Sequence, residues 1–365
     1  MKILIISTNS DEAGAPRHAE TIISQLSDVH DFSFASGEQG PVFHRLESKG
    51  IPVYFLAELR SQFSLFVDFV CLVKLLKIIK HSRPDVLHLH SAKAGMLGRI
   101  CGLVLGIPVV YTVHGWGWRG MSFLPSFILK SIEYIFKYVP NVAYVFVSES
   151  LVADAENILK FQKSQFKVIQ NGISDMPATL EYRQHDVLKL IMPARVCSAK
   201  DHETLLKAYT KLPNSFVLTL CGEGTDEPSF RTFVHSIVGD RISNIDFLGM
   251  RSDVDALLES SDIFVLSSFF EALPISIIEA MCVGLPVVAS NVGGVAELVI
   301  DQESGFVFET GNYAQLALIL TSLSDVELRR KVGESARLRF LNHFTVDRMI
   351  ASLNDVYLSA QQFRS

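Results

Sequence analysis

The chain has 365 residues, of which 48% are hydrophobic and 20% are charged, and its formal net charge is −6. This composition is typical of a globular protein long enough for two domains; it excludes a disordered chain, a small disulfide scaffold and a polybasic protein with nucleic acid as its main partner. The five cysteines lie far apart, without a CxxC pair or histidines at zinc-finger spacing, so we expect no structural metal site and a reducing cytoplasmic compartment.

Short apolar runs of strand length alternate with helical periodicity through the first half of the chain. Parallel strands need crossover helices, and strands covered on both faces become continuously apolar, so this alternation predicts βαβ units. The long uncharged stretch from Ile100 to Trp118 is interrupted at Gly106-Ile107-Pro108, and we expect buried α/β core there. The expected strands are Ile3–Ile6, Val53–Leu56, Val86–Leu89, Val109–Val113, Val142–Val147 and Phe166–Ile169.

The polar stretch Ser174–Asp186 interrupts the alternation and is predicted to be a linker. A second set of runs follows: Leu188–Met192, Phe216–Leu220, Ile245–Leu248, Ile263–Leu266, Pro286–Ala289 and Gly305–Phe308. The fold class is therefore α/β, with two doubly wound, Rossmann-like domains over residues 1–173 and 187–344 that face a central cleft. The segment from Thr345, about 345–365, is predicted to form a helix that could pack back on the first domain.

Glycine motifs after the strands give weak signals. A dinucleotide-binding fold would show G-x-G-x-x-G after the first strand, but only Gly14 is present. The interpretation of the chain as a dehydrogenase therefore loses its main support. Gly14 would let the backbone approach a ligand at the start of a helix, and an ordinary loop glycine is an equally good interpretation. Gly222 belongs to a lone G-x-G that permits a tight turn facing the cleft.

His114 ends the expected strand Val109–Val113 and is followed by Gly115. A core histidine would usually sit inside an apolar run, so this position favours a side chain that hydrogen-bonds a ligand.

Arg195 and Lys200 follow the strand Leu188–Met192. Ligands of open α/β sheets bind beyond the carboxyl ends of the strands, and two cations there could neutralise a diphosphate. Solvated surface cations are the alternative for this pair taken alone.

Glu271 and Glu279 flank a predicted helix start with Pro274 at its first position. The free amides of Ile275 and Ser276, at the positive end of that helix, would offer a site for a diphosphate. Two ordinary helix-entry glutamates explain the pattern equally well.

Asp253-Val254-Asp255 spells the DxD of metal-dependent glycosyl transfer but heads the helical segment Asp253–Glu259, where acidic residues interact favourably with the helix dipole. We interpret it as a helix cap and expect no metal.

Together these residues resemble glycosyltransferase family 4, a family of retaining enzymes with the GT-B fold. The run from Glu271 to Met281, continued through Gly284-Leu285-Pro286 to Gly293-Gly294 and Glu297, is similar to the E-x7-E signature. Further matches are Arg195 and Lys200 with R-x4-K, Asn171-Gly172 with the NG motif, Phe247-Leu248-Gly249 with the base-binding corner, and Pro84-Asp85 with His90. The family's G-G-A-E-R-H loop differs here, because Ala13-Gly14-Ala15-Pro16-Arg17-His18 replaces it.

The resemblance implies a role for each matching residue. Glu279 would bind the donor ribose, Glu271 would contact the transferred sugar, Arg195 and Lys200 would hold the diphosphate, and His114 would reach the sugar from the other domain. The implied catalytic residues are thus Glu271, His114, Arg195 and Lys200. The expected donor-binding residues are Gly14, Gly222, Met250, Arg251, Ile275, Ser276 and Glu279.

The predicted function is retaining, metal-independent transfer of a hexosyl group from a nucleotide-diphosphate donor, expected to be a UDP-sugar, to a hydroxyl of a glycan or lipid-linked acceptor. The resemblance points to assembly of a surface polysaccharide such as O-antigen, capsule or exopolysaccharide, with no cofactor. A GT-B nucleotide-sugar epimerase and a non-catalytic sugar-nucleotide-binding protein remain the alternatives.

Peripheral attachment to the cytoplasmic face of the inner membrane is predicted from apolar segments in the first domain. Trp116 and Trp118 suit the headgroup layer, and Phe127–Tyr138 can form an apolar face edged by Lys130 and Lys137. Phe63–Val70, followed by Lys74, Lys77 and Lys80, is a second candidate. Packing of both helices on the sheet is the alternative.

Overall fold

The computed structural model describes residues 1–59, 64–119, 122–176, 182 and 186–362, and it divides into two compact units. Unit 1 comprises Met1–Asn171 and Val346–Ser365, and unit 2 comprises Gly172–Thr345. The predicted linker lies within unit 2, and residues 177–181 and 183–185 of it are outside the described residues.

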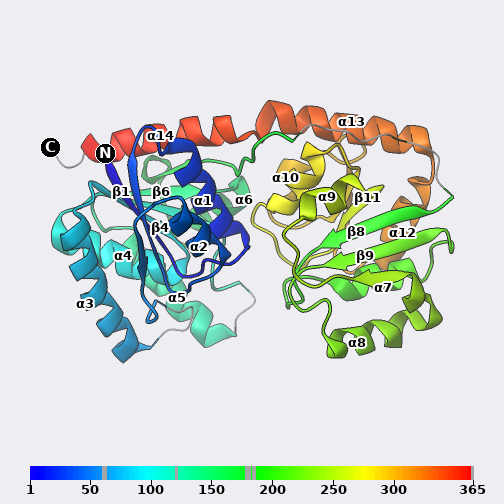
Figure 1. The fold of residues 1–365 in the computed structure, drawn as a ribbon, viewed down its shortest axis with the longest axis horizontal. Helices are drawn as coiled ribbons and strands as arrows, with labels where there is room; N and C mark the ends of the chain where they lie inside the picture. Colours follow the sequence, from blue (N-terminus) through cyan, green and yellow to red (C-terminus); the bar gives the residue numbers. More distant parts are fainter. Residues whose placement is uncertain (60–63, 120–121, 177–181, 183–185, 363–365) are drawn as a thin grey trace. The chain divides into compact units, whose positions relative to one another are not determined.

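Unit 1 is built on a seven-stranded parallel sheet in the order β3-β2-β1-β4-β5-β6-β7 (Figure 1). Its central strands are continuously buried, as expected for a sheet with helices on both faces. The strands are β1 (Lys2–Ser7), β2 (Asp31–Ser36), β3 (Val53–Phe55), β4 (Val86–His90), β5 (Val109–Val113), β6 (Val142–Phe146) and β7 (Phe166–Val168). The helices are α1 (Gly14–Leu26), α2 (Pro41–Ser48), α3 (Leu65–Ser82), α4 (Ala92–Leu105), α5 (Phe123–Phe136), α6 (Glu149–Asn157) and the short η1 (Lys163–Gln165).

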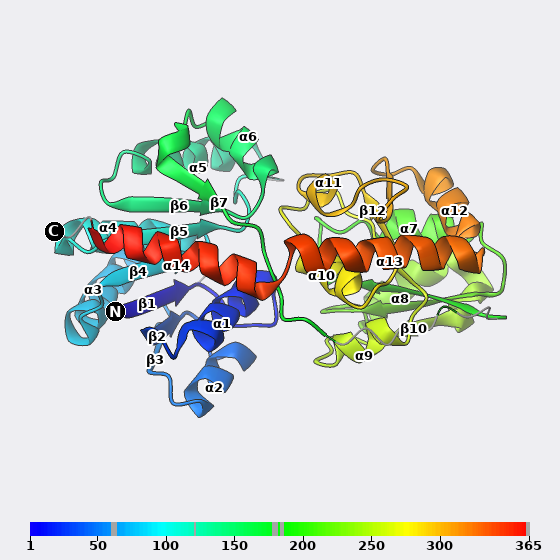
Figure 2. The ribbon, with the colours of Figure 1, turned by 90° about the horizontal axis from the view of Figure 1, so that it is seen from above.

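The C-terminal helix α14 (Val346–Gln362) belongs to unit 1, although unit 2 separates it from the rest of that unit in the sequence. Its apolar face, which includes Met349, Leu353 and Tyr357, joins the core formed by β1, β4, β5 and α1 (Figure 2). The amphipathic spacing of these side chains explains why the segment is helical and which face it buries.

Unit 2 repeats the architecture with a six-stranded parallel sheet in the order β10-β9-β8-β11-β12-β13. The strands are β8 (Leu188–Pro193), β9 (Phe216–Cys221), β10 (Ile245–Phe247), β11 (Ile263–Leu266), β12 (Val287–Ser290) and β13 (Phe306–Phe308). The helices are α7 (His202–Tyr209), α8 (Pro228–Val238), α9 (Val254–Glu259), α10 (Ile275–Cys282), α11 (Val295–Leu298), α12 (Tyr313–Ser322) and α13 (Val326–His343), with η2 (Gly239–Asn244) after α8.

The predicted α/β fold with two Rossmann-like domains is confirmed. Among the described residues, the strand that the sequence did not predict is β2, whose residues Asp-Phe-Ser-Phe-Ala-Ser alternate apolar with small or polar side chains. In both sheets the strand order reverses at one place, between β1 and β4 in unit 1 and between β8 and β11 in unit 2. Open α/β sheets bind ligands at such switch points, beyond the carboxyl ends of the strands.

A buried ion pair links helix α5 to α4 in unit 1. Glu133 accepts hydrogen bonds at 2.7 and 2.8 Å from both terminal nitrogens of Arg99, whose guanidinium also donates to Tyr144. Glu133 is the only buried residue of α5, and most of its apolar side chains face outward. Most of the apolar side chains of this helix are therefore not covered by the sheet. Within the residues that the structure describes, no helix combines the length and apolar character needed to cross a bilayer.

Candidate functional site

The switch point of unit 2 gathers the cations and carboxylates that the sequence singled out. Arg195 and Lys200 lie in the loop between β8 and α7, and Glu271 lies in the loop between β11 and α10. Lys200 donates a hydrogen bond to Oε1 of Glu271, and Ser268 Oγ donates to the same oxygen at 2.7 Å. Residues 71 positions apart in the chain therefore form one polar cluster, in which Glu271 is buried.

Main-chain hydrogen bonds hold the two loops together. Asp201 N donates to Ser267 O at 3.0 Å, and Ser267 Oγ donates back to Asp201 O at 2.7 Å. Phe269 N donates to Ala199 O at 2.9 Å. Asp201 also caps α7 by accepting from the amide of Thr204 at 3.1 Å. The cation loop is thus fixed on both sides before any ligand binds.

Arg195 is exposed, and within the described part of the chain its guanidinium has no carboxylate partner. The difference between the two cations is that Glu271 already neutralises Lys200. An anion that binds here can pair with Arg195 directly, but it must share Lys200 with Glu271.

The helix N-terminus beside this cluster offers further donors. Helix α10 begins at Ile275, and Pro274 is its N-cap. The sequence analysis had placed Pro274 one position further along, as the first residue of the helix. In the described residues no acceptor takes the amides of Ile275 and Ser276, whereas Ile277 N donates to Pro274 O at 3.2 Å. Two main-chain donors at the positive end of a helix suit an anion.

Glu279 is buried inside α10, one turn beyond these amides. Burial, followed by the charges of Arg251, Asp253 and Glu279, sets the pKa of Cys221, which is raised to about 12. Glu271 lies in the loop before α10 and Glu279 lies within that helix, so both belong to the corner between β11 and α10.

Two glycines are required by the backbone of this corner. Gly293 has φ +50°, and a Cβ added there would lie 1.7 Å from the carbonyl oxygen of Glu271. Gly222 has φ +133°, and a Cβ there would lie 2.6 Å from the carbonyl of Ala194, next to Arg195. Only glycine lets these loops approach so closely. The sequence analysis had found only weak support for a role of Gly222, from a lone G-x-G.

The other predicted donor-binding residues of unit 2 are at its surface. Met250 and Arg251 follow Gly249, whose carbonyl accepts from the amide of Gly222 at 2.7 Å. Arg251 forms two hydrogen bonds to Asp253, at 2.7 and 2.6 Å. Asp253 occupies the N-cap position of α9, but its side chain accepts no amide of that helix. Asp253 is therefore at the predicted cap position, but its carboxylate pairs with Arg251 and not with an amide of the helix.

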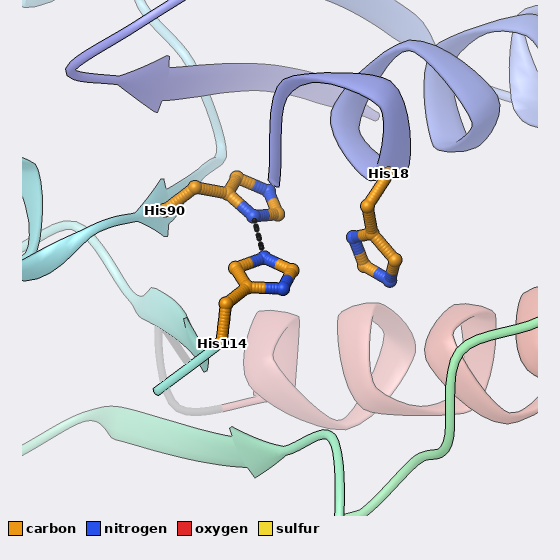
Figure 3. A group of neighbouring side chains, drawn as sticks. All are labelled: His18, His90 and His114. Atoms are coloured by element: carbon orange, nitrogen blue, oxygen red, sulfur yellow. Dashed lines mark hydrogen bonds between the residues drawn. The ribbon is translucent and has the colours of Figure 1, made fainter. Parts of the chain in front are cut away.

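The switch point of unit 1 carries three histidines instead of charged groups. His90 is the last residue of β4, His114 directly follows β5, and His18 lies on α1 after β1. Figure 3 shows the three rings gathered around one point, with a hydrogen bond of 2.8 Å between His90 Nδ1 and His114 Nε2. His114 is half-buried, whereas His18 and His90 are buried.

Burial keeps these histidines neutral. It lowers the pKa of His18 to about 4 and the pKa of His90 and His114 well below the usual value, and the neighbouring histidines lower the last two further. The sequence analysis named His90 as part of a family pattern but gave a role in binding to His114 alone. The signal that it missed is that His90 and His114 stand at the ends of two strands that follow each other in the chain. Ser91, directly after His90, has φ +74°, a backbone conformation that is uncommon for residues other than glycine.

The remaining predicted residues of unit 1 are a glycine at a helix start and two tryptophans. Gly14 is the exposed first residue of α1. Trp116 and Trp118 stack on one another with ring centroids 4.4 Å apart and are only 4% and 5% exposed. They belong to the core, so the prediction that they meet lipid headgroups is wrong; residues 120–121 are outside the described residues.

Comparison with known proteins identifies both units. The model of the family described as Glycosyltransferase Family 4 matches residues 13–175, and that of Glycosyl transferases group 1 matches residues 182–339. The chain is a glycosyltransferase with these two domains. The expected family is thereby confirmed, and the Glu271, Arg195 and Lys200 cluster lies in its group 1 domain.

Curated relatives match over nearly their full length. The UDP-Gal:alpha-D-GlcNAc-diphosphoundecaprenol alpha-1,3-galactosyltransferase of Escherichia coli is 25% identical over 90% of this chain and 89% of its own. The N,N'-diacetylbacillosaminyl-diphospho-undecaprenol alpha-1,3-N-acetylgalactosaminyltransferase of Campylobacter jejuni is 26% identical over 86% and 88%. A crystal structure of Anabaena HepE in complex with UDP and glucose has a TM-score of 0.83 at 22% identity and covers 98% of this chain and 100% of that chain.

Proposed function

We propose that the protein transfers a sugar from a UDP-sugar to a hydroxyl of a glycan carried on a lipid diphosphate, in the assembly of a bacterial surface polysaccharide. The observation that carries the proposal is the convergence of Arg195, Lys200 and the free amides of Ile275 and Ser276 at one switch point. The relatives named above act on diphosphoundecaprenol-linked sugars, and the HepE structure holds UDP, which supports this choice of acceptor and donor.

In the proposed reaction the donor diphosphate lies against the two cations and the start of α10, with Glu279 on the ribose. Charge develops on the leaving diphosphate as the bond to the sugar breaks, and preorganised cations and amides stabilise that charge. Glu271 contacts the transferred sugar, and Ser268 and Lys200 hold its carboxylate in place.

The same arrangement supports transfer with retained anomeric configuration. A leaving phosphate oxygen can accept the proton of the acceptor hydroxyl on the same face of the sugar, so no separate carboxylate base is required, in contrast to glycosidases. We propose that turnover needs no metal ion, since Arg195, Lys200 and α10 supply the positive charge. Activity that excess chelator abolishes and manganese restores would contradict this part.

A donor screen tests the proposal. The full chain is incubated with several nucleotide sugars and a lipid-diphosphate-linked sugar, and release of nucleoside diphosphate is measured together with the configuration of the new linkage by NMR. We expect acceptor-dependent release of UDP and a retained linkage. Isomerisation of the donor without an acceptor would show an epimerase, and donor binding without either product would show a non-catalytic binding protein.

Two helices of unit 1 support a further part of the proposal, peripheral attachment to the cytoplasmic face of the inner membrane. In α3, Phe66 and Phe69 are 78% and 64% exposed, and in α5, Phe123 and Phe127 are 84% and 58% exposed. Exposed aromatic side chains beside basic residues suit a bilayer surface.

Lys77, Lys80 and Lys130 provide basic residues on these helices. Lys137 does not, because it is buried and donates to the carbonyls of Leu159 and Lys160 at 2.6 and 3.0 Å. The earlier prediction for Lys137 is therefore corrected. Residue 63, the first of the other predicted segment Phe63–Val70, lies outside the described residues.

A further inference from the structure

The geometry of His18, His90 and His114 points to a binding site for one divalent transition-metal ion of the zinc class, within unit 1. One nitrogen from each of the three rings lies within 4.8 Å of the others. The ring centroids are 4.9 to 5.5 Å apart, and the rings come from three separate elements around one point (Figure 3). We propose that this triad holds such an ion with a fourth position left open.

The donor set selects the class of ion. Three imidazoles and no oxygen ligand suit zinc, cobalt, nickel or copper, whereas magnesium and calcium require oxygen ligands.

One nitrogen atom of the triad has unused hydrogen-bonding capacity that an ion would satisfy: His18 Nδ1 is buried, and within the described residues it has no hydrogen-bond partner. His90 Nε2 also has no partner among these residues, but the ion would bind His90 through Nδ1. Buried polar atoms without partners are rare and call for an explanation such as a missing ion. A metal ion that accepts the lone pair of His18 Nδ1 would explain why this atom has no hydrogen-bond partner.

The spacing needs only a local adjustment. Tetrahedral zinc with Zn–N distances of about 2.0–2.1 Å places its ligand nitrogens about 3.3–3.4 Å apart. His90 Nδ1 and His114 Nε2 are already 2.8 Å apart, where the ion would replace the shared proton. His18 has to move toward them, and a rotation of its ring breaks no hydrogen bond at Nδ1.

A neighbouring histidine restrains the site. The ring of His88 lies 4.3 Å from that of His90 and is held by Tyr357 on α14 at 2.6 Å and by Thr112 on β5 at 2.8 Å. His90 is therefore packed against a ring that cannot turn freely, which helps to fix its orientation.

One consequence rests on the proposed function. If His114 faces the transferred sugar, an ion that occupies the triad competes with the sugar, so the metal-free protein is the active form and zinc inhibits it. Binding of the ion itself does not depend on that function.

The test is a cobalt titration of the full chain without a histidine tag, after removal of metal by a chelator. We expect one equivalent of Co²⁺ with the visible absorption of a tetrahedral site. Replacement by His18→Ala, or by the size-matched His18→Gln, should weaken binding about tenfold or more. The matched control is His44→Ala on α2, which replaces an exposed histidine outside the triad and should leave binding unchanged.

Circular dichroism and UDP binding by unit 2 establish that each variant is folded. Absence of the tetrahedral spectrum, or equal binding by wild type and both His18 variants, would overturn the proposal and indicate adventitious binding only. If cobalt binds at the triad but no nucleotide sugar is turned over, the proposed function fails and the metal site stands. If transfer occurs and zinc binds without inhibiting it, only the predicted competition is wrong.

Discussion

The two units share one architecture, yet their switch points carry opposite chemistry. In unit 2 the loops after β8 and β11 bring together Arg195, Lys200 and Glu271, fixed by main-chain hydrogen bonds. In unit 1 the elements after β1, β4 and β5 bring together three neutral histidines. A diphosphate requires charge, whereas a sugar hydroxyl or a zinc-class ion is bound by neutral imidazoles. The fold provides the place for a site, and the residues after the strands determine its ligand.

The largest effect is expected from removing either cation of unit 2. Loss of one charged partner of a desolvated diphosphate should cost about 2–4 kcal/mol of transition-state stabilisation, or roughly thirty- to a thousandfold in rate. Arg195→Ala and Lys200→Ala are compared with Lys207→Ala, whose exposed ion pair with Glu203 lies outside the cluster. Transfer near the wild-type rate in both folded variants would contradict the proposed role of the cations.

The close approach at Gly293 gives a test of preorganisation in unit 2. Gly293→Ala places a methyl group against the carbonyl of Glu271 and should displace that loop, with a loss of about a hundredfold in kcat/KM. Gly311→Ala is the control, because Gly311 also has positive φ, +78°, but has open space around it. Equal losses in both variants would show that backbone strain, and not the position of Glu271, causes the effect.

The exposed aromatic side chains of α3 and α5 allow a test of whether unit 1, and not unit 2, contacts the membrane. Phe66→Asp and Phe127→Asp should each reduce co-sedimentation with anionic liposomes about tenfold, since burying one aromatic side chain contributes about 1.5–3 kcal/mol. Leu318→Asp on α12 of unit 2, where Leu318 is 73% exposed, should leave binding unchanged. If the wild-type protein stays in the supernatant at low and high salt, the membrane proposal is wrong.

The ion pair between Lys200 and Glu271 predicts opposite effects on two measurements. Glu271→Gln removes a negative charge that competes with the diphosphate for Lys200, so UDP should bind about threefold more tightly. Turnover should fall, because the contact to the sugar is altered. Weaker UDP binding in Glu271→Gln, measured by calorimetry, would show that Glu271 supports the nucleotide rather than competing with it.

The sequence predicted much of the fold but only part of the sites. Continuous apolar runs identified the buried strands, whereas the alternating β2 escaped because a half-polar strand resembles a loop. The Trp116–Trp118 pair resembled an interfacial anchor, and only its stacking in the core shows otherwise. The strand ends placed Lys200 and Glu271 at one edge of the sheet, but their ion pair depends on loop conformations that local sequence does not determine.

The most direct test of the central claim is calorimetric titration of UDP into folded Lys200→Ala and His114→Ala proteins. If unit 2 alone holds the diphosphate, Lys200→Ala should weaken UDP binding by about tenfold to a hundredfold, the range of a hydrogen bond to a charged group. His114→Ala should stay within about twofold of the wild type. Equal loss in both variants, or a loss in His114→Ala alone, would contradict the assignment of charge recognition to unit 2.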